Sequence, residues 1–355
     1  MTVKSPSSFL LTESILMKPQ TLIRSTSAAA VLCFAACSSY AADGFKLRFP
    51  VAGTLGGEIV APLPTEGWAV SLAVTDVRVT QINGEDGGPI QIPRNLGPAA
   101  AVVNIKVNNY HVTQNNLSLA HILDRDVQGG KLVFAVNIPY ASTFETDLTF
   151  GATVGGITVP PETPQLAQQS KDASVSTSGL GDIETSLLWE KSFDQIKMLA
   201  GATLALPTGN YKYQPGALSP NIGFGNFYTL RTGLGVAYRA SETLTLGARG
   251  SLGFNTQNMD NYVRSGDYYA IDLAAAFRTP VGVVGPHLIT LRQYTDDTGG
   301  TLGPNRVSIT GAGFFYTVPI RALAGGLNVA YMKTTNSKNS LDGDFVQLRF
   351  SKVFF

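Results

Sequence analysis

The sequence predicts an all-β fold, a transmembrane antiparallel β-barrel of about twelve strands with short periplasmic turns and long extracellular loops. Three observations predict it: segments that alternate apolar and polar residues, connections that alternate in length, and no apolar run long enough for a membrane-spanning helix. The clearest alternation lies in Tyr228–Arg239 and Thr243–Asn255, which a turn at Ser241 and Glu242 joins. Each segment has about the ten residues that a tilted strand needs to cross a bilayer.

The composition is poor in charge. Charged residues make up 14% of the 355 residues, below the roughly 25% of soluble proteins, while the apolar fraction of 44% is ordinary. The net charge of +1 provides no basic surface for a polyanion, so we expect no nucleic acid as a partner.

Residues 1–41 have the pattern of an export leader, with translation starting at Met1 or at Met17 and cleavage after Ala41. Cleavage there would remove Cys33 and Cys37, the two cysteines of the chain. The alternative is a lipoprotein, in which Cys37 carries a lipid anchor. From Met17 the parts would be a charged region with Lys18 and Arg24, an apolar core at Ala28–Ala36 and a cleavage site at Ser39–Ala41.

The segment 42–66 is rich in Gly and Pro and lacks alternation, so we expect an irregular arm that is either disordered or plugs the lumen of a barrel formed by 67–355. In the N-terminal half, Leu117–Asp126 is ambiguous and admits a short helical turn. Thr153–Ser178 is expected to be a long polar loop without a fold of its own. The expected strands here are Trp68–Val74, Ala101–Asn108 and Leu132–Tyr140, with a bulge or bilayer exit at Val77 and a local break at Pro139.

The C-terminal half repeats one rhythm, in which short connections alternate with long polar ones, as periplasmic turns and outer loops do in barrels. The short connections are Ser192–Gln195, Ala240–Glu242, Thr279–Gly282 and Pro319–Gly325, and the long ones are Pro207–Gly225, Thr256–Gly266, Thr295–Asn305 and Thr335–Gly343. The expected strands are Asp182–Glu190, Lys197–Leu206, Tyr228–Arg239, Thr243–Asn255, Tyr268–Arg278, Val283–Tyr294, Arg306–Val318, Gly326–Thr334 and Asp344–Phe354.

The alternation also assigns the two faces of the wall. On one strand Ile271, Leu273 and Phe277 would face lipid while Asp272 and Arg278 face the lumen, because a cation at the lipid midplane costs about 2 to 4 kcal/mol. The last strand ends in aromatic residues, as outer-membrane proteins generally do, so we expect the barrel insertion machinery to recognise Phe354 or Phe355.

Charged residues with inward parity are the candidate lumen-lining residues. They either set the selectivity of an open path or form Arg–carboxylate pairs that fill and stiffen the lumen. Six are basic and three are acidic: Asp182, Glu184, Arg231, Arg239, Arg249, Asp272, Arg278, Arg292 and Arg349.

Several turn motifs resemble those of the outer-membrane family named for the meta pathway of phenol degradation. They are Gly179–Ile183 before one strand, Leu206–Tyr211 after the next, Arg264–Asp267, Tyr294–Gly299, and Gly343 with Asp344 before the last strand. The resemblance covers nearly the whole chain after the leader. It implies a twelve-stranded channel in the outer membrane of a Gram-negative bacterium that admits small hydrophobic or aromatic solutes, in contact with outer-membrane lipid and lipopolysaccharide. It implies no catalytic residue and no cofactor.

The alternatives are a lipid-acting outer-membrane enzyme and a barrel with an adhesin or structural role. Such an enzyme needs a nucleophile and a positioned base, and none of His111, His121 and His287 has a recognisable partner arrangement in the sequence. Acidic residues of the expected outer loops are most simply solvated turn residues, with Ca²⁺ binding or lipopolysaccharide bridging as the alternative; they are Glu85, Asp86, Asp296 and Asp297.

Overall fold

A computed structural model describes residues 66–96, 99–212, 221–299, 306–323 and 325–354. The leader, the arm up to Thr65 and Phe355 therefore lie outside the described residues. The elements are β1 (Gly67–Asn83), β2 (Gln91–Leu96), β3 (Ala99–Val127), β4 (Gly130–Val154), β5 (Ile157–Val159), α3 (Pro164–Asp172), β6 (Val175–Leu180), β7 (Glu184–Phe193), β8 (Ile196–Ala205), β9 (Thr229–Arg239), β10 (Leu244–Asn255), β11 (Tyr268–Thr279), β12 (Gly282–Gln293), β13 (Ser308–Ile320), the 3₁₀ turn η1 (Arg321–Leu323), β14 (Gly325–Lys338) and β15 (Ser340–Phe354).

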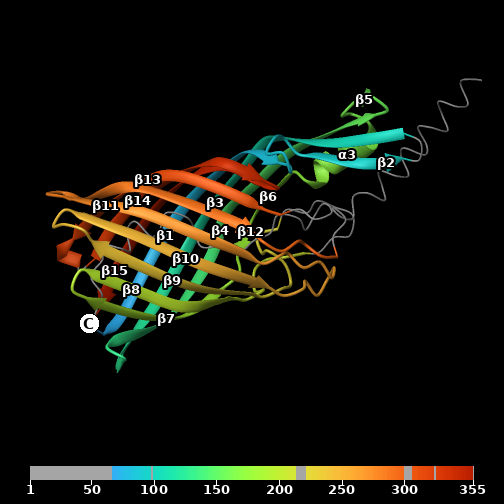
Figure 1. Cartoon of the computed structure of the whole chain (residues 1–355). Coiled ribbons are helices and arrows are strands. Elements are labelled where there is room, and N and C mark those ends of the chain that lie inside the picture. Colours follow the sequence, from blue (N-terminus) through green and yellow to red (C-terminus); the bar gives the residue numbers. More distant parts are fainter. Residues whose placement is uncertain (1–65, 97–98, 213–220, 300–305, 324, 355) are drawn as a thin grey trace, which may run out of the picture.

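Twelve antiparallel strands close into a barrel (Figure 1). From β7 to β15 each strand pairs with the next; β15 pairs with β1, β1 with β3, β3 with β4, and β4 with β7. The ring therefore has no open edge at the level of the membrane, as a membrane-spanning sheet requires. Each of the twelve expected strands falls within an observed strand, but Ala101–Asn108 lies in the outer half of β3, whereas the part of β3 that pairs with β1 in the barrel is His111–Ile122.

The wall has the two faces that the alternation predicts. On β11 the side chains of Ile271, Leu273 and Phe277 are 41–45% exposed, while Asp272 and Ala274 are buried. Strands on both sides repeat this parity, so an apolar belt surrounds the barrel. This belt in a closed barrel places the protein in the outer membrane of a Gram-negative bacterium.

The connections alternate in length as expected, with one exception. Two-residue turns at 128–129, 194–195 and 280–281 lie at the end of the barrel that carries the C-terminus, which is therefore the periplasmic end. The prediction of a long loop at Thr335–Gly343 is wrong, because β14 and β15 continue as a tight hairpin around Asn339, whose φ is +48°. Asn is among the few residues that adopt this left-handed conformation readily.

Two strands are much longer than the bilayer requires. β3 has 29 residues and β4 has 25, and their outer halves project beyond the barrel as an extension (Figure 1). Leu117–Asp126 is thus strand and not a helical turn, because its two neighbours β1 and β4 supply ladder partners on both sides.

The prediction of a featureless loop at Thr153–Ser178 is also wrong. This segment forms β5, α3 and β6, all of which lie against the outer half of β4. Leu166 of α3 is completely buried in a core with Val103, Ile105 and Phe150. The apolar pattern of α3 is only one turn long, which is why the sequence alone gives no clear signal for it.

β4 continues through Pro139 without the break that the sequence predicts, but its neighbouring strand changes there. Up to Asn137 the outer edge of β4 pairs with β7, and from Tyr140 it pairs with β6. Beyond β6, Ser170 and Ser174 of the α3 region accept hydrogen bonds from the Phe150 and Leu148 amides at 3.0 and 3.2 Å. Side chains thereby provide hydrogen-bond partners for backbone amides on the part of the β4 edge that lies outside the barrel.

β1 leaves the bilayer near Val77. Its outward residues change from apolar Leu72 and Val74 to Asp76 and Arg78, while Val79 points inward and is buried. The bulge that the sequence offers as an alternative occurs later, between Val79 and Gln81. Among the described helices, none is long and apolar enough to cross a membrane.

Candidate functional site

Half of the lumen wall is lined by small polar side chains. On β15, β1, β3, β4, β7 and β8 some inward-facing residues, such as Thr75 and Gln347, are buried, but others are only half-buried although they face away from lipid, so their exposed surface faces the lumen. Hydrogen bonds join them in neighbouring pairs: Ser351 to Ser71 at 3.0 Å, Ser118 to Asn137 at 2.9 Å, and Ser186 to Thr203 at 2.8 Å. These six residues are called the hydroxyl stripe below.

The opposite half of the lumen wall is packed. Inward residues of β9 to β14 are buried, among them Ala237, Ala276 and Phe315. His287 also lies here at 3% exposure, with its ring 6.3 Å from that of Phe315 and nearly parallel to it. Open lumen surface is therefore concentrated on the side of the hydroxyl stripe.

An ion pair crosses the inner wall near the extracellular end. The guanidinium of Arg231 on β9 donates two hydrogen bonds to the carboxylate of Glu184 on β7, at 2.7 and 2.8 Å. The side chain of Arg231 is 7% exposed and that of Glu184 is 22% exposed. Tyr268 is fully buried beside them, with its ring over Gly253, where any Cβ would collide with it. Bidentate pairing is the geometry that stabilises a desolvated Arg and carboxylate.

A second ion pair lies on the adjacent ladder. Arg249 of β10 and Asp272 of β11 are direct cross-strand neighbours, and two guanidinium nitrogens donate to Oδ2 of Asp272 at 2.9 and 2.7 Å. Four of the nine candidate lumen residues thus form two largely buried pairs. This is the predicted alternative in which Arg–carboxylate pairs fill and stiffen the lumen.

The other candidates are dispersed. Arg239 and Arg278 are exposed at the periplasmic ends of β9 and β11, and Arg349 is half-buried on the inner face of β15. The inward assignment of Arg292 is wrong: it is exposed and lies across from Tyr269 on the outer face. The sequence misleads here because both faces of β12 carry apolar residues: Leu288 is exposed on the outer face with Arg292, while Ile289 and Leu291 are buried on the inner face.

Asp182 lies in the loop before β7 and organises the outer loops. Its Oδ1 accepts the Gly209 amide at 2.9 Å and its Oδ2 accepts the Phe224 amide at 3.0 Å. Gly209 and Gly223 come so close that a Cβ on either would be within 2.7–2.8 Å of the other's backbone. The Gly-rich motifs around Asp182 and Gly209 thus support one loop junction.

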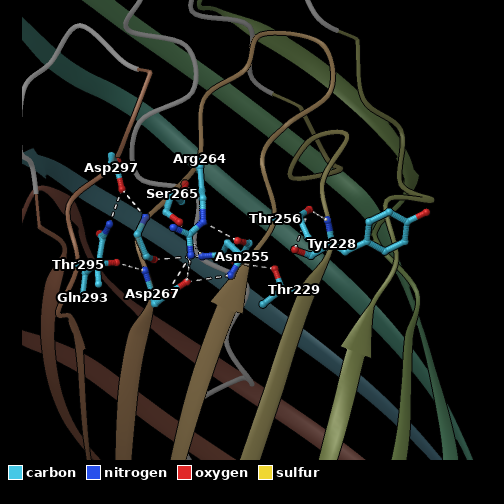
Figure 2. A network of polar contacts seen from close by, with 11 residues as sticks. Tyr228, Thr229, Asn255, Thr256, Arg264, Ser265, Asp267, Gln293, Thr295 and Asp297 are labelled. Carbon is cyan, nitrogen blue, oxygen red and sulfur yellow. Dashed lines mark hydrogen bonds and ion pairs between the residues drawn. The ribbon is translucent and has the colours of Figure 1, made fainter.

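A polar network connects the extracellular ends of β9 to β12 (Figure 2). Arg264 donates to both carboxylate oxygens of Asp267 at 2.8 Å and to the Asn255 carbonyl at 2.8 Å, and Thr229 donates to the Asn255 side chain at 2.7 Å. Asp297 accepts the Gly266 amide at 2.8 Å and the side-chain amide of Gln293. Burial raises the pKa of the Asp297 carboxyl above its ordinary value, although these two hydrogen bonds oppose the shift.

The histidines do not form a hydrolytic centre. On the outer face, His111 Nε2 lies 2.5 Å from Asp76 and 3.4 Å from the Thr113 hydroxyl. A base that activates a hydroxyl needs its orienting carboxylate on the other ring nitrogen, whereas here one nitrogen faces both groups. His121 stacks on Trp68. In the described ranges, no group of three His, Cys, Asp or Glu side chains is placed to hold a metal ion.

An apolar groove of about 480 Å³ lies across β9 to β12. Most of its lining residues have outward parity, so it opens toward lipid and is separate from the hydroxyl stripe. They include Val236, Tyr238, Leu246, Leu273 and Leu288.

The four paired charges are recognisable as inward-facing in the sequence, whereas the hydroxyl stripe is not. The signal was present, because Ser71, Ser118, Ser186 and Thr203 all have the inward parity of their strands. Ser and Thr are common on solvated strand faces, so this pattern gains meaning only when closure brings six strands together.

The comparisons with known proteins agree with this fold. The family model described as "Putative MetA-pathway of phenol degradation" matches residues 95–350. No curated protein matches the chain significantly. The COG4313 outer membrane channel from Pseudomonas putida F1 is similar in structure, with a TM-score of 0.61 and 15% identity, covering 87% of this chain and 100% of that one.

Two other solved structures are less similar. The β domain of the Bordetella autotransporter BrkA has a TM-score of 0.43 at 9% identity, covering 81% of this chain and 100% of its own. The CymD monoaromatic hydrocarbon channel has a TM-score of 0.39 at 11% identity, covering 88% of this chain and 94% of its own.

Proposed function

Because this chain belongs to the family described as "Putative MetA-pathway of phenol degradation", we propose that it is a passive outer-membrane channel that admits small hydrophobic or aromatic solutes. The observation that carries the proposal is the hydroxyl stripe, a continuous lumen surface of partly exposed small side chains on six adjacent strands. A wall that served only to anchor another element would gain stability by filling this space.

The chemistry of the stripe suits small solutes with an apolar body. Hydroxyl groups donate and accept weak hydrogen bonds without a fixed charge, so they release a solute as readily as they bind it. The neighbouring inward residues Ala69, Ala120 and Ala135 add small apolar surface. The charges of the upper lumen are paired in Glu184–Arg231 and Arg249–Asp272, which lowers the field that an uncharged aromatic must cross.

Cysteine scanning in planar bilayers tests the path. In a background without Cys33 and Cys37, Ser186→Cys places a thiol in the stripe, and the adjacent Leu187→Cys places one on the lipid face, where Leu187 is 54% exposed. We expect discrete conductance steps from both variants. A charged thiol reagent is expected to lower the conductance of S186C by more than half and to leave L187C unchanged.

If the thiol reagent lowered the conductance of both variants equally, or of neither, the solute path would lie elsewhere in the barrel. Absence of discrete conductance together with measurable lipid hydrolysis would favour the lipid-acting enzyme instead. Liposome uptake of a small phenol compared with a sugar of similar size then tests the solute class, and faster entry of the sugar would contradict it.

A further inference from the structure

We propose that the extracellular ends of β12, β13 and β14 bind the phosphate groups of a lipopolysaccharide molecule in the outer leaflet. The site consists of Arg292 on β12 with Lys333 and Lys338 on β14, all exposed on the outer face. These three residues are called the cation shelf below.

The register brings the cation shelf together. Ser308 of β13 pairs with Arg292 on one side and with Lys338 on the other, so the two cations flank one small residue. Closer to the membrane, Thr290 and Thr310 are neighbours with their hydroxyls 3.4 Å apart, and Lys333 pairs with Ala312. Long cationic side chains therefore surround a shallow surface of small, hydroxyl-bearing residues.

The depth of the shelf matches lipid headgroups. On β12 and β14 the shelf residues lie on the extracellular side of the exposed apolar residues Leu288 and Tyr331, which are 51% and 39% exposed, and on β13 between them the apolar belt ends with Phe314 at 65% exposure. The short turns place the opposite end of these strands in the periplasm, so the shelf lies at the outer leaflet. A ligand here contacts hydrocarbon on its membrane side and the cations on its extracellular side.

The cations of the shelf differ from neighbouring cations in their pairing. In the part of the chain that the structure describes, none of its three cations forms an ion pair, whereas nearby Arg78 pairs with Asp76 and Arg306 with Asp296. Three acids lie near the shelf without pairing with it: Asp344, between Lys333 and Arg78, and Glu85 and Asp86, in the turn whose Gly87 packs against the stem of Lys338. An anionic headgroup attached to acyl chains satisfies both the charge and the adjoining apolar surface, which free phosphate or a soluble protein does not.

Binding of purified lipopolysaccharide to the detergent-solubilised protein tests the site. Each cation near a membrane surface contributes about fivefold in affinity, so Arg292→Gln with Lys333→Gln and Lys338→Gln is expected to weaken binding about a hundredfold. The matched control is Lys352→Gln, an outward cation at the periplasmic rim that lies 4.7 Å from the Phe354 ring centroid. It is expected to bind as the parent does.

Three results would overturn the proposal: a triple variant that binds like the parent, equal loss in the K352Q control, or equal binding of dephosphorylated lipid A, which would leave only acyl contact. Competition by inorganic phosphate alone at micromolar concentration would also contradict it. The heat-dependent gel shift verifies that each variant is folded. If the triple variant does not fold, K338Q alone is expected to bind about fivefold less tightly, and unchanged affinity would refute the site.

Discussion

At the scale of single residues, the interior of the barrel is governed by the cost of burying charge. Arg231 and Asp272 are each less than a tenth exposed, and both have an oppositely charged partner within 2.9 Å. An unpaired charge at either position would lose hydration without replacement. The pairs stiffen the lumen wall. The hydroxyl stripe, which carries no charge, remains as the surface open to solutes.

Glu184→Gln tests the buried pair. The substitution leaves the Arg231 cation uncompensated at 7% exposure, so we expect a loss of about 3 kcal/mol in the free energy of unfolding. The double variant with Arg231→Met is expected to recover most of it, because both charges are then absent. Urea unfolding in detergent measures this, with Glu242→Gln in an exposed turn as the control. An additive double variant would show that the pair does not couple.

The pH dependence of the loop network depends on Asp297. Its pKa is raised above the ordinary 3.8, so the folded state favours the protonated form and the charge reduces stability above the raised pKa. Asp297→Asn keeps the acceptor oxygen for the Gly266 amide. We expect this variant to melt higher than the parent at pH 7, with an advantage that declines as the pH falls toward 3.8. A difference independent of pH would contradict this assignment.

At the scale of elements, the distinctive feature is the extension built on the outer halves of β3 and β4. These strands continue past the bilayer because β2 pairs with β3, while β5, β6 and α3 cover the edge of β4. The apolar residues of this part face a small core under α3 instead of lipid. An element outside the membrane needs its own buried surface to remain ordered.

Leu166→Ala tests whether the extension is stable independently of the barrel. Leu166 is fully buried in the core under α3, so its truncation is expected to cost about 2 to 5 kcal/mol locally. Hydrogen exchange should accelerate in Thr146–Leu180 and stay unchanged in β9 to β12. Faster exchange throughout the barrel would show that the two parts unfold together.

At the scale of the whole molecule, closure of the ring is the dominant fact. Every barrel strand has two antiparallel neighbours, so the backbone is satisfied within the bilayer. Closure also joins β15 to β1 and β4 to β7, which unites the six strands of the hydroxyl stripe.

A closed barrel of this kind should resist detergent. Without heating, the protein is expected to migrate anomalously on a denaturing gel, and boiling should shift it to the position of the unfolded chain. The control is a sample refolded without detergent, which should show one position at both temperatures. A protein that remains in the soluble periplasmic fraction without a gel shift would refute the membrane barrel.

The sequence by itself determined the twelve strands, the lipid face and most of the short turns, because the period of two and the turn residues act locally. It also identified Glu184, Arg231, Arg249 and Asp272 as inward-facing. Only the tertiary structure decided which of these pair, that Arg292 faces outward, that Thr153–Ser178 folds over β4, and that small polar residues of six strands form one surface. These features depend on register and ring closure, which bring together residues far apart in the chain and leave no local pattern.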